Sequence, residues 1–351
     1  MPGISLLPPS SDPVRLFEVF NGSFGSKLLV AAARHFRLFE KLGDSDCSFE
    51  ELANRLELAD RPTHVLVTAL CALGLLAKQA ERYSLTAMAK DFLVPSSPFD
   101  VSDYLDLAAD APGVVRLVES MRTNRPKGTQ QDGEGAQYIY RDGLNSAMSD
   151  TQKAQRLTMA LAGRARTTAP LLAGRISLDD CELLLDVAAG TGFFSIAFLQ
   201  RYPNLRAKVL ELPKVVPLVK ELAQAHGVAD RLEVVAGNMF HDPWPQADAI
   251  LLSNVLHDWD VLDCLKLLER CREALPPGGR VLIHDAFLND SLDGPLPIAI
   301  YSIVLFFLTE GRAYSLAEYR EWLQLCGFEP GEVQPTIVHC GVLSAVKRGT
   351  E

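Results

Sequence analysis

The chain has 351 residues, which is long enough for two folded domains. Of these residues, 48% are hydrophobic and 22% are charged, a composition that excludes a disordered chain. Its 44 acidic residues against 34 basic ones give a formal net charge of −10. This balance argues against a protein that binds nucleic acid or an anionic membrane, because both partners need a basic face.

The pattern of cysteines and the expected lack of a targeting signal predict a cytoplasmic protein. The seven cysteines are scattered and contain no C-x-x-C pair, and the N-terminus has no basic segment and is broken by prolines, so we expect no signal peptide. The longest apolar run, 297–308, is shorter than the roughly 20 residues that span a bilayer. We interpret it as a buried helix and expect no membrane partner.

The first 100 residues predict short helices followed by a hairpin. Apolar spacing and a capping box at Ser48 and Glu51 predict helices over 14–20, 27–39, from 49 onward and over 61–76. Residues 77–86 are typical of two short strands around a polar turn. This order is that of a winged helix.

Winged helices often bind DNA, which this one is not equipped to do. A recognition helix presents Arg, Lys, Asn or Gln to a groove, but the helix over 61–76 offers Arg61 and His64 and is otherwise apolar or small. Residues 1–100 contain 10 Lys+Arg and 12 Asp+Glu, a net charge of −2. We therefore predict that 1–100 is a winged-helix dimerisation domain that joins a homodimer, and a winged-helix transcriptional regulator is the less favoured alternative.

Residues 101–178 are predicted to be a helical connector that contributes to a substrate pocket. The segment 124–143 is rich in Gly, Gln, Asp and Arg and is predicted to be a loop, whereas 146–172 has helical periodicity. The apolar faces of that helix carry Met148, Met159 and Leu161.

Strands and helices alternate in the remaining domain, 179–351. Short apolar strands are expected over 183–187, 207–211, 232–236, 249–253 and 280–285, and the helices between them over 193–201, 214–226 and 262–275. Two further strands, 328–333 and 341–346, follow without an intervening helix. The prediction is an α/β fold: a Rossmann-like, doubly wound parallel sheet with an antiparallel C-terminal strand.

The first strand runs into a glycine-bearing turn that opens a helix. Gly190 and Gly192 let the backbone approach a ligand closely, and Glu211 follows 21 positions later at the end of the second strand. An acidic side chain there accepts hydrogen bonds from both hydroxyls of a ribose. The glycines alone would suit NAD equally well.

The third strand is followed by a loop suited to adenine, because Asn238 offers hydrogen bonds and Met239 and Phe240 offer contact with the ring. The fourth strand leads to His257, and His284 or Asp285 closes the fifth. Ligands of such sheets lie beyond the carboxyl ends of the strands, so His257 is placed where catalytic groups belong.

In chain order, the segments LLDVAAGTG, LELP, GNMF, NVLHDWD and LPPGGRVLI resemble a class I S-adenosylmethionine-dependent O-methyltransferase. The resemblance is to the homodimeric caffeic-acid O-methyltransferase-like small-molecule family, of the bacterial natural-product type, and covers nearly the whole chain.

The resemblance implies a set of functional residues. S-adenosylmethionine, with S-adenosylhomocysteine as product, would be held by Asp186, Ala188, Gly190, Gly192, Glu211, Asn238, Met239, Phe240 and Ser253. The catalytic residues would be His257 as general base, Asp285 beside it, and Asp258. The substrate pocket would contain Tyr140, Met148, Phe306 and Tyr314, and no metal is expected.

The chain departs from the family pattern at several positions. Ala188 and Ala189 replace two glycines, a mild change if their dihedral angles are ordinary, and Asn238 replaces an aspartate. Ser253 stands where the plant enzymes have a lysine. A second glutamate beside the base would fall near Ala313 and is missing.

The predicted reaction is methyl transfer to a hydroxyl of a small aromatic molecule, with His257 accepting the proton. Transfer to carbon or another non-oxygen atom is the alternative, since a His base would serve enolisation as well. A metal-assisted reaction would need further ligands, for which His284 is the obvious candidate. An NAD-dependent oxidoreductase would explain Gly190, Gly192 and Glu211, but not the segments around Asn238 and His257.

Overall fold

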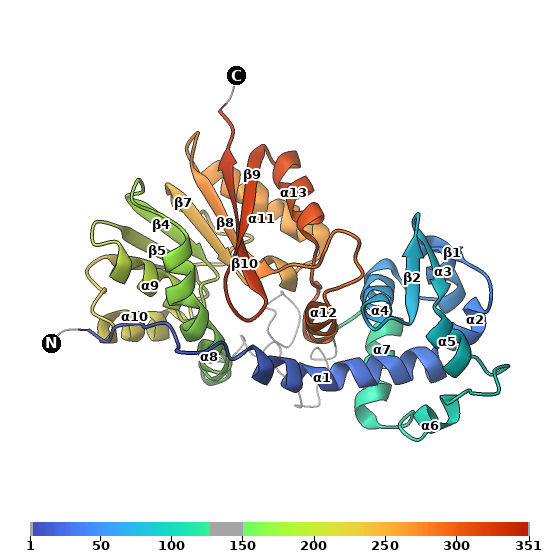
Figure 1. Ribbon diagram of the computed structural model, residues 1–351. Coiled ribbons are helices and arrows are strands. Elements are labelled where there is room, and N and C mark those ends of the chain that lie inside the picture. Colours follow the sequence, from blue (N-terminus) through green and yellow to red (C-terminus); the bar gives the residue numbers. More distant parts are fainter. Residues whose placement is uncertain (1–2, 127–149, 350–351) are drawn as a thin grey trace. The chain divides into compact units, whose positions relative to one another are not determined.

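The computed structural model describes residues 3–126 and 150–349 (Figure 1). These residues form two compact units. The first unit holds the described residues of 1–14, 138–287 and 317–351, and the second holds those of 15–137 and 288–316. The predicted connector is divided between the two units, whereas the functional boundaries at 100 and 178 stay a prediction.

The second unit is helical with one small sheet. Its helices are α1 (Val14–Val30), α2 (Leu38–Leu42), α3 (Phe49–Leu56), α4 (Asp60–Ala72), α5 (Ala87–Phe92), α6 (Ser102–Asp106), α7 (Pro112–Thr123) and α12 (Leu296–Leu308), and a π-helical turn, η1 (Ala31–His35), extends α1. The sheet has the order β1 (Cys47–Ser48), β3 (Arg82–Leu85), β2 (Leu76–Gln79), all antiparallel.

Local signals explain most of these elements. The capping box is present, because the Ser48 side chain accepts from the backbone N–H of Glu51 and the Glu51 side chain accepts from that of Ser48. The hairpin over 76–85 is confirmed. The helix predicted over 61–76 ends instead at Ala72, because Gly74 takes a left-handed conformation (φ 72°) that turns the chain into β2.

The predicted break between the first two helices is wrong. The sequence Asn-Gly-Ser over 21–23 and Gly25 disfavour a helix, yet α1 runs through them without interruption. A Cβ added at Gly25 would lie 2.6 Å from Cδ1 of Ile300, so the glycine permits close contact between α1 and α12. Tertiary packing therefore overrides the local preference.

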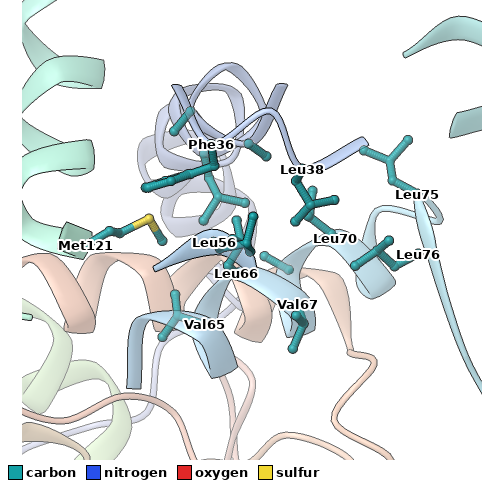
Figure 2. Packing of buried hydrophobic residues seen from close by; sticks show 14 of the residues in the cluster. Phe36, Leu38, Leu56, Val65, Leu66, Val67, Leu70, Leu75, Leu76 and Met121 are labelled. Carbon is teal, nitrogen blue, oxygen red and sulfur yellow. The ribbon is translucent and has the colours of Figure 1, made fainter. Parts of the chain in front are cut away.

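The core of the second unit encloses α4 (Figure 2). Leu66 and Leu70 lie in it with Phe36 and Leu38, and Met121 of α7 closes one side. The buried apolar run expected over 297–308 is confirmed as α12, part of which joins the same core.

Arg61, the main candidate for reading DNA, is engaged within this unit. Its Nη1 donates to the carbonyls of Thr309 (2.9 Å) and Gly311 (3.0 Å), and the guanidinium lies 4.3 Å from the centre of the Phe306 ring. The helix that would read DNA is thus a core element of its own unit.

The first unit is a seven-stranded sheet. Its strands are β4 (Leu183–Val187), β5 (Arg206–Glu211), β6 (Leu232–Ala236), β7 (Ala249–Ser253), β8 (Arg280–Ala286), β9 (Phe328–Pro335) and β10 (Cys340–Lys347). Their order is β6-β5-β4-β7-β8-β10-β9; the first five are parallel, and β10 is antiparallel to both of its neighbours. This confirms the predicted α/β fold with an antiparallel C-terminal strand, which is β10.

The helices of the first unit are α8 (Thr151–Arg175), α9 (Phe193–Arg201), α10 (Val216–Ala225), α11 (Val261–Ala274) and α13 (Leu316–Leu325). A short 3₁₀ turn, η4 (Leu256–Asp258), follows β7. No helix in 3–126 or 150–349 has the length and apolar character needed to cross a bilayer.

The side chains of α8 correct one prediction. Met159 and Leu161 are 42% and 48% exposed, rather than on a buried apolar face. The buried face contains Leu157 and Leu172 and several small residues, among them Ala154, Thr158 and Ala162, which repeat every four positions. These small residues allow α8 to lie close to α9.

Candidate active site

The predicted cofactor and base residues come together within the first unit. They follow the carboxyl ends of β4, β5, β6, β7 and β8, which lie next to one another and point the same way. Successive strands add outward from β4 through β5 to β6 on one side and from β7 to β8 on the other. The site therefore lies at the reversal of strand order, where open α/β sheets bind their ligands.

The turn after β4 is left-handed at three positions. Ala188, Gly190 and Gly192 have φ angles of 54°, 58° and 71°. The dihedral angle of Ala188 is therefore not ordinary, so the change from glycine is not mild there, and this residue carries a penalty of about 1 kcal/mol that glycine would avoid. The turn is held by the Ala188 N–H, which donates to the carbonyl of Leu210 (2.9 Å).

Glu211 is the last residue of β5, and its side chain contacts this turn. Its carboxylate accepts from the backbone N–H of Gly190 (2.8 Å) and of Leu212 (2.7 Å). Burial raises the pKa of Glu211 to about 7, although both hydrogen bonds oppose the shift. The carboxylate is thus held at the turn, with lone pairs left to accept from a ligand's hydroxyls.

Asp186 lies beneath the turn, near the end of β4. Its Oδ2 accepts from the hydroxyl of Ser195 (2.7 Å), and burial raises its pKa to about 7. The other oxygen, Oδ1, is buried and has no hydrogen-bond partner among the described residues. A buried carboxylate oxygen without a donor among the described residues is free to accept a hydrogen bond from a ligand, which suits a ligand site.

The loop after β6 is ordered by its own contacts. The side-chain oxygen of Asn238 accepts from the N–H of Phe240 (2.8 Å), so the amide replacing the family's aspartate keeps the loop turn. The carbonyl of Met239 accepts from Nε1 of Trp244 (2.9 Å). Phe240 packs edge-on against Trp259, with ring centres 4.6 Å apart, which joins this loop to the segment carrying His257.

Ser253 contacts a neutral histidine. Its hydroxyl lies 2.9 Å from Nδ1 of His284, whose Nε2 lies 3.1 Å from the hydroxyl of Thr336. Burial and the charge of Arg164 lower the pKa of His284 to about 3. Both ring nitrogens are engaged, and no group of three or more possible metal ligands occurs in the described residues.

His257 forms a close pair with Asp285. Its Nδ1 lies 2.5 Å from Oδ1 of Asp285, its Nε2 lies 3.6 Å from the carboxylate of Asp258, and the two paired side chains are 4% and 1% exposed. Nδ1–H therefore donates to Asp285, and Nε2 is the nitrogen that can accept a proton.

The charges around His257 set its protonation. Burial alone would lower its pKa, but Asp285 and Asp258 outweigh burial and raise it. In return, His257 holds the pKa of Asp285 below its usual value against burial, whereas burial raises the pKa of Asp258 to about 6. This pattern, a histidine oriented by a buried carboxylate, is that of a general base.

One residue in contact with the predicted site is missed by the sequence reasoning. Tyr319 of α13 donates its hydroxyl to Oδ2 of Asp285 (3.1 Å), and its ring packs edge-on against Phe287 and Trp322. No motif marks Tyr319. From the sequence one could expect only that the hydroxyl of a buried tyrosine makes a hydrogen bond, and not which group accepts it.

The predicted substrate residues lie outside the described part of the first unit. Tyr140 and Met148 lie outside the described residues. Phe306 and Tyr314 are buried in the second unit, where Arg61 lies over the ring of Phe306 and Arg312 over that of Tyr314. Their role in substrate binding stays a prediction.

The site suits an adenosyl cofactor better than a metal. The turn after β4 is left-handed at three positions, the Glu211 carboxylate beside it can accept hydrogen bonds from ligand hydroxyls, and the loop from Asn238 to Phe240 combines an amide with a thioether and an aromatic ring.

Comparisons with known proteins agree with this description. The family model of the O-methyltransferase dimerisation domain matches residues 17–95, and that of the O-methyltransferase domain matches 117–329. The chain is 34% identical to 3-hydroxy-5-methyl-1-naphthoate 3-O-methyltransferase of Streptomyces sahachiroi, over 91% of this chain and 90% of that protein. It is 30% identical to L-tyrosine C(3)-methyltransferase of Streptomyces lavendulae, over 90% and 88%.

Among solved structures, an O-methyltransferase family 2 protein of Planctomyces limnophilus in complex with apigenin is 41% identical, with a TM-score of 0.90 over 99% of this chain and 100% of that one. Human N-acetylserotonin methyltransferase in complex with S-adenosylmethionine shares the fold, at 23% identity and a TM-score of 0.60, over 98% and 100%. The chain belongs to the S-adenosylmethionine-dependent O-methyltransferases.

Proposed function

We propose that this O-methyltransferase transfers a methyl group to a phenolic hydroxyl of a small, planar aromatic molecule and that His257 removes the phenolic proton. The pair formed by His257 and Asp285 carries the proposal. The relatives support the acceptor class, because one is named for a hydroxylated naphthoate and one was solved with apigenin.

The cofactor supplies an activated methyl group on a sulfonium. The residues that would hold it are Glu211 at the ribose, Gly190 and Gly192 in the turn at the methionine part, and Asn238 to Phe240 at the adenine, with Asp186 and Ser253 beside them. Alignment of acceptor and donor can account for about 7–11 kcal/mol of the barrier.

The chain's own chemical contribution is proton removal. A phenol with a pKa of about 10 and an ordinary histidine at about 6.5 differ by roughly 3.5 units, or about 5 kcal/mol. Asp285 and Asp258 raise the pKa of His257 and so reduce this difference. Asp285 also fixes the ring so that Nε2 faces away from the pair. Base catalysis of this kind typically contributes about 10²–10⁴-fold.

The test is the variant His257→Gln, assayed with a panel of hydroxylated aromatic acceptors. We expect kcat/KM to fall at least about 10²-fold while S-adenosylhomocysteine binds as in the wild type. The control is His35→Gln, which changes a histidine bound to the Ala109 carbonyl in the second unit. Turnover of His257→Gln at the level of His35→Gln would exclude the base role.

A second candidate is methylation at a ring carbon. It is favoured by the 30% identity to L-tyrosine C(3)-methyltransferase, and removal of a phenolic proton would activate the neighbouring ring carbon as well as the oxygen. The position of the new methyl group in the product, read by NMR, decides between the two.

We further propose that the dimerisation domain joins two copies of this chain. The match over 17–95 supports it, as do the apolar side chains Leu16, Val19 and Phe20 of α1, which are 73%, 80% and 78% exposed. Light scattering at micromolar concentration should give twice the mass of one chain. A cytoplasmic location is proposed from the seven free thiols, and cell fractionation tests it.

A further inference from the structure

Asn254 directly follows β7, at the reversal of strand order between β4 and β7. It takes a left-handed conformation (φ 55°), which asparagine tolerates better than most residues, and its N–H donates to the carbonyl of His284 (2.8 Å). Its side-chain Nδ2 donates to the hydroxyl oxygen of Ser253 (3.1 Å). Its Oδ1 is buried and has no hydrogen-bond partner among residues 3–126 and 150–349. A buried amide oxygen without a donor is a place where a ligand can donate.

The contacts of Ser253 fix the orientation of the Asn254 amide. Because the Ser253 oxygen accepts from Asn254, the single hydroxyl proton of Ser253 is left to donate to Nδ1 of His284 (2.9 Å). His284 is neutral, since burial lowers its pKa to about 3, so its one ring proton lies on Nε2 and is donated to the hydroxyl of Thr336 (3.1 Å). These four side chains form one directed series of hydrogen bonds, which begins at Asn254 and leaves its oxygen available as an acceptor.

Asp186 presents a second oxygen of this kind, Oδ1, on the face of the sheet that carries Ser253. Side chains alternate along a strand, and Asp186 is paired with the residue two positions before Ser253, which is itself paired with His284. All three side chains therefore point to one face, where Asp186 and His284 both contact α9. Asp285, the residue after His284, points to the opposite face.

The donor that suits these two oxygens is an ammonium group. An ammonium has three N–H groups and accepts nothing, and its charge would offset the burial that raises the pKa of Asp186 to about 7. In the proposed placement of the cofactor, the ribose hydroxyls donate to Glu211 and the adenine amine to the loop 238–240, which leaves the α-ammonium of the methionine part. The acceptor hydroxyl fits less well, because it must reach His257, whose partner Asp285 points to the other face.

We propose that Asn254 binds the α-ammonium of S-adenosylmethionine through its side-chain oxygen, together with Oδ1 of Asp186. Ser253 and His284 are positioning residues, which hold the Asn254 amide with its nitrogen toward Ser253 and its oxygen toward the ligand. This inference rests on the proposed placement of the methionine part at the turn after β4. It does not depend on His257 and can be measured without an acceptor.

The test is titration calorimetry of the full-length protein with two ligands: S-adenosylhomocysteine, and its analogue in which hydrogen replaces the α-ammonium. Asn254→Gly removes the amide and keeps a residue that adopts positive φ. It should weaken S-adenosylhomocysteine at least about tenfold and leave the affinity of the analogue unchanged. Asn254→Asp, which keeps an oxygen there, should retain the preference for S-adenosylhomocysteine. The control is Asn124→Gly, at another left-handed asparagine (φ 50°), which should bind both ligands as the wild type does.

The positioning role is read from the same pair of ligands. Ser253→Ala should lower the preference for S-adenosylhomocysteine over the analogue, because the Asn254 amide loses its acceptor, whereas a purely structural role would weaken both ligands alike. Equal weakening of the two ligands in Asn254→Gly, or a wild type that does not distinguish them, would overturn the proposal.

Glu211→Gln separates that failure from a wrong placement of the cofactor. Both ligands keep the ribose, so this variant should weaken both by the same factor and leave the preference for S-adenosylhomocysteine unchanged. If both ligands bound Glu211→Gln as they bind the wild type, the placement itself would be wrong, and the role of Asn254 with it.

Discussion

The hydroxyl of Tyr319 donates to Oδ2 of Asp285 over 3.1 Å, while Oδ1 of the same carboxylate accepts from His257 (2.5 Å) and from the backbone N–H of Ala286 (2.8 Å). Both oxygens of Asp285 are therefore held by donors. The second glutamate that the family resemblance implies near Ala313 is missing, and Tyr319 helps to hold the carboxylate of Asp285 in place.

Tyr319→Phe should lower both stability and turnover. Removing the hydroxyl leaves a buried carboxylate oxygen short of a donor, which costs about 1–3 kcal/mol in the free energy of unfolding. We expect kcat to fall several-fold because Asp285 orients His257 less firmly. Denaturant unfolding and steady-state kinetics measure the two effects. The control is Tyr202→Phe, which removes a hydroxyl that donates to the Ile176 carbonyl (2.8 Å). Equal kcat in the two variants would contradict the role of Tyr319.

Asp285→Asn should reduce kcat/KM by about 10²-fold or more, because the amide can no longer stabilise the imidazolium that forms when His257 accepts a proton. The acid limb of the pH profile should move to lower pH, since the carboxylate that raises the pKa of His257 is lost. The control is Asp263→Asn, at a buried carboxylate of α11 that pairs with Lys266 (2.9 Å). If the acid limb of the pH profile stayed in place in Asp285→Asn, the limb would not reflect a His257 pKa that Asp285 raises.

Ala188→Gly should stabilise the protein by about 1 kcal/mol, because glycine adopts the left-handed conformation at φ 54° without the Cβ penalty. The neighbouring substitution Ala189→Gly is the control, since Ala189 is not left-handed and glycine there only gains freedom in the unfolded chain. We expect the melting temperature to rise in Ala188→Gly and to fall in Ala189→Gly. A fall in both would mean that Ala188 is unstrained.

Glu211 makes cofactor binding depend on pH. Its folded pKa, about 7, lies above the ordinary value, so its proton stabilises the ligand-free fold below pH 4.5, and this stability is lost as the pH rises through about 7. Ribose hydroxyls donate to the carboxylate form, so S-adenosylhomocysteine should bind about tenfold more weakly at pH 6 than at pH 8.

Calorimetry of Glu211→Gln checks this prediction. The amide has no charge to lose, so its affinity should be at least tenfold lower at pH 8 and nearly constant with pH. The control is Glu233→Gln, at a surface carboxylate paired with Lys208 (3.2 Å). A wild-type affinity that is the same at pH 6 and pH 8 would contradict the prediction.

Much of the first unit could be predicted from local patterns. The strands over 183–187, 232–236 and 249–253 have the predicted bounds, because short apolar runs between turns have one plausible conformation in a parallel sheet. The parallel order brings the strand ends together, which is why residues as far apart in sequence as Gly190, Glu211 and His257 could be assigned to one edge.

Local patterns fail where distant packing decides. A glycine-bearing stretch breaks a helix in isolation, yet α1 continues through Gly25 because Ile300 packs against it. The exposed Met159 and Leu161 are another case, since two faces of α8 carry apolar or small residues and only the contact with α9 selects the buried one. Helical spacing defines a face but not its partner.

The sequence by itself determined the class of fold and the family, and it predicted which residues hold the cofactor and which acts as the base, because each of these lies at or after a strand end in a recognisable order. The tertiary structure decided which groups surround His257 and Asp285. Tyr319 comes from a helix that carries no motif, and it reaches Asp285 through a contact between segments 34 residues apart. Such contacts depend on how helices pack against the sheet, and one sequence contains no local record of that packing.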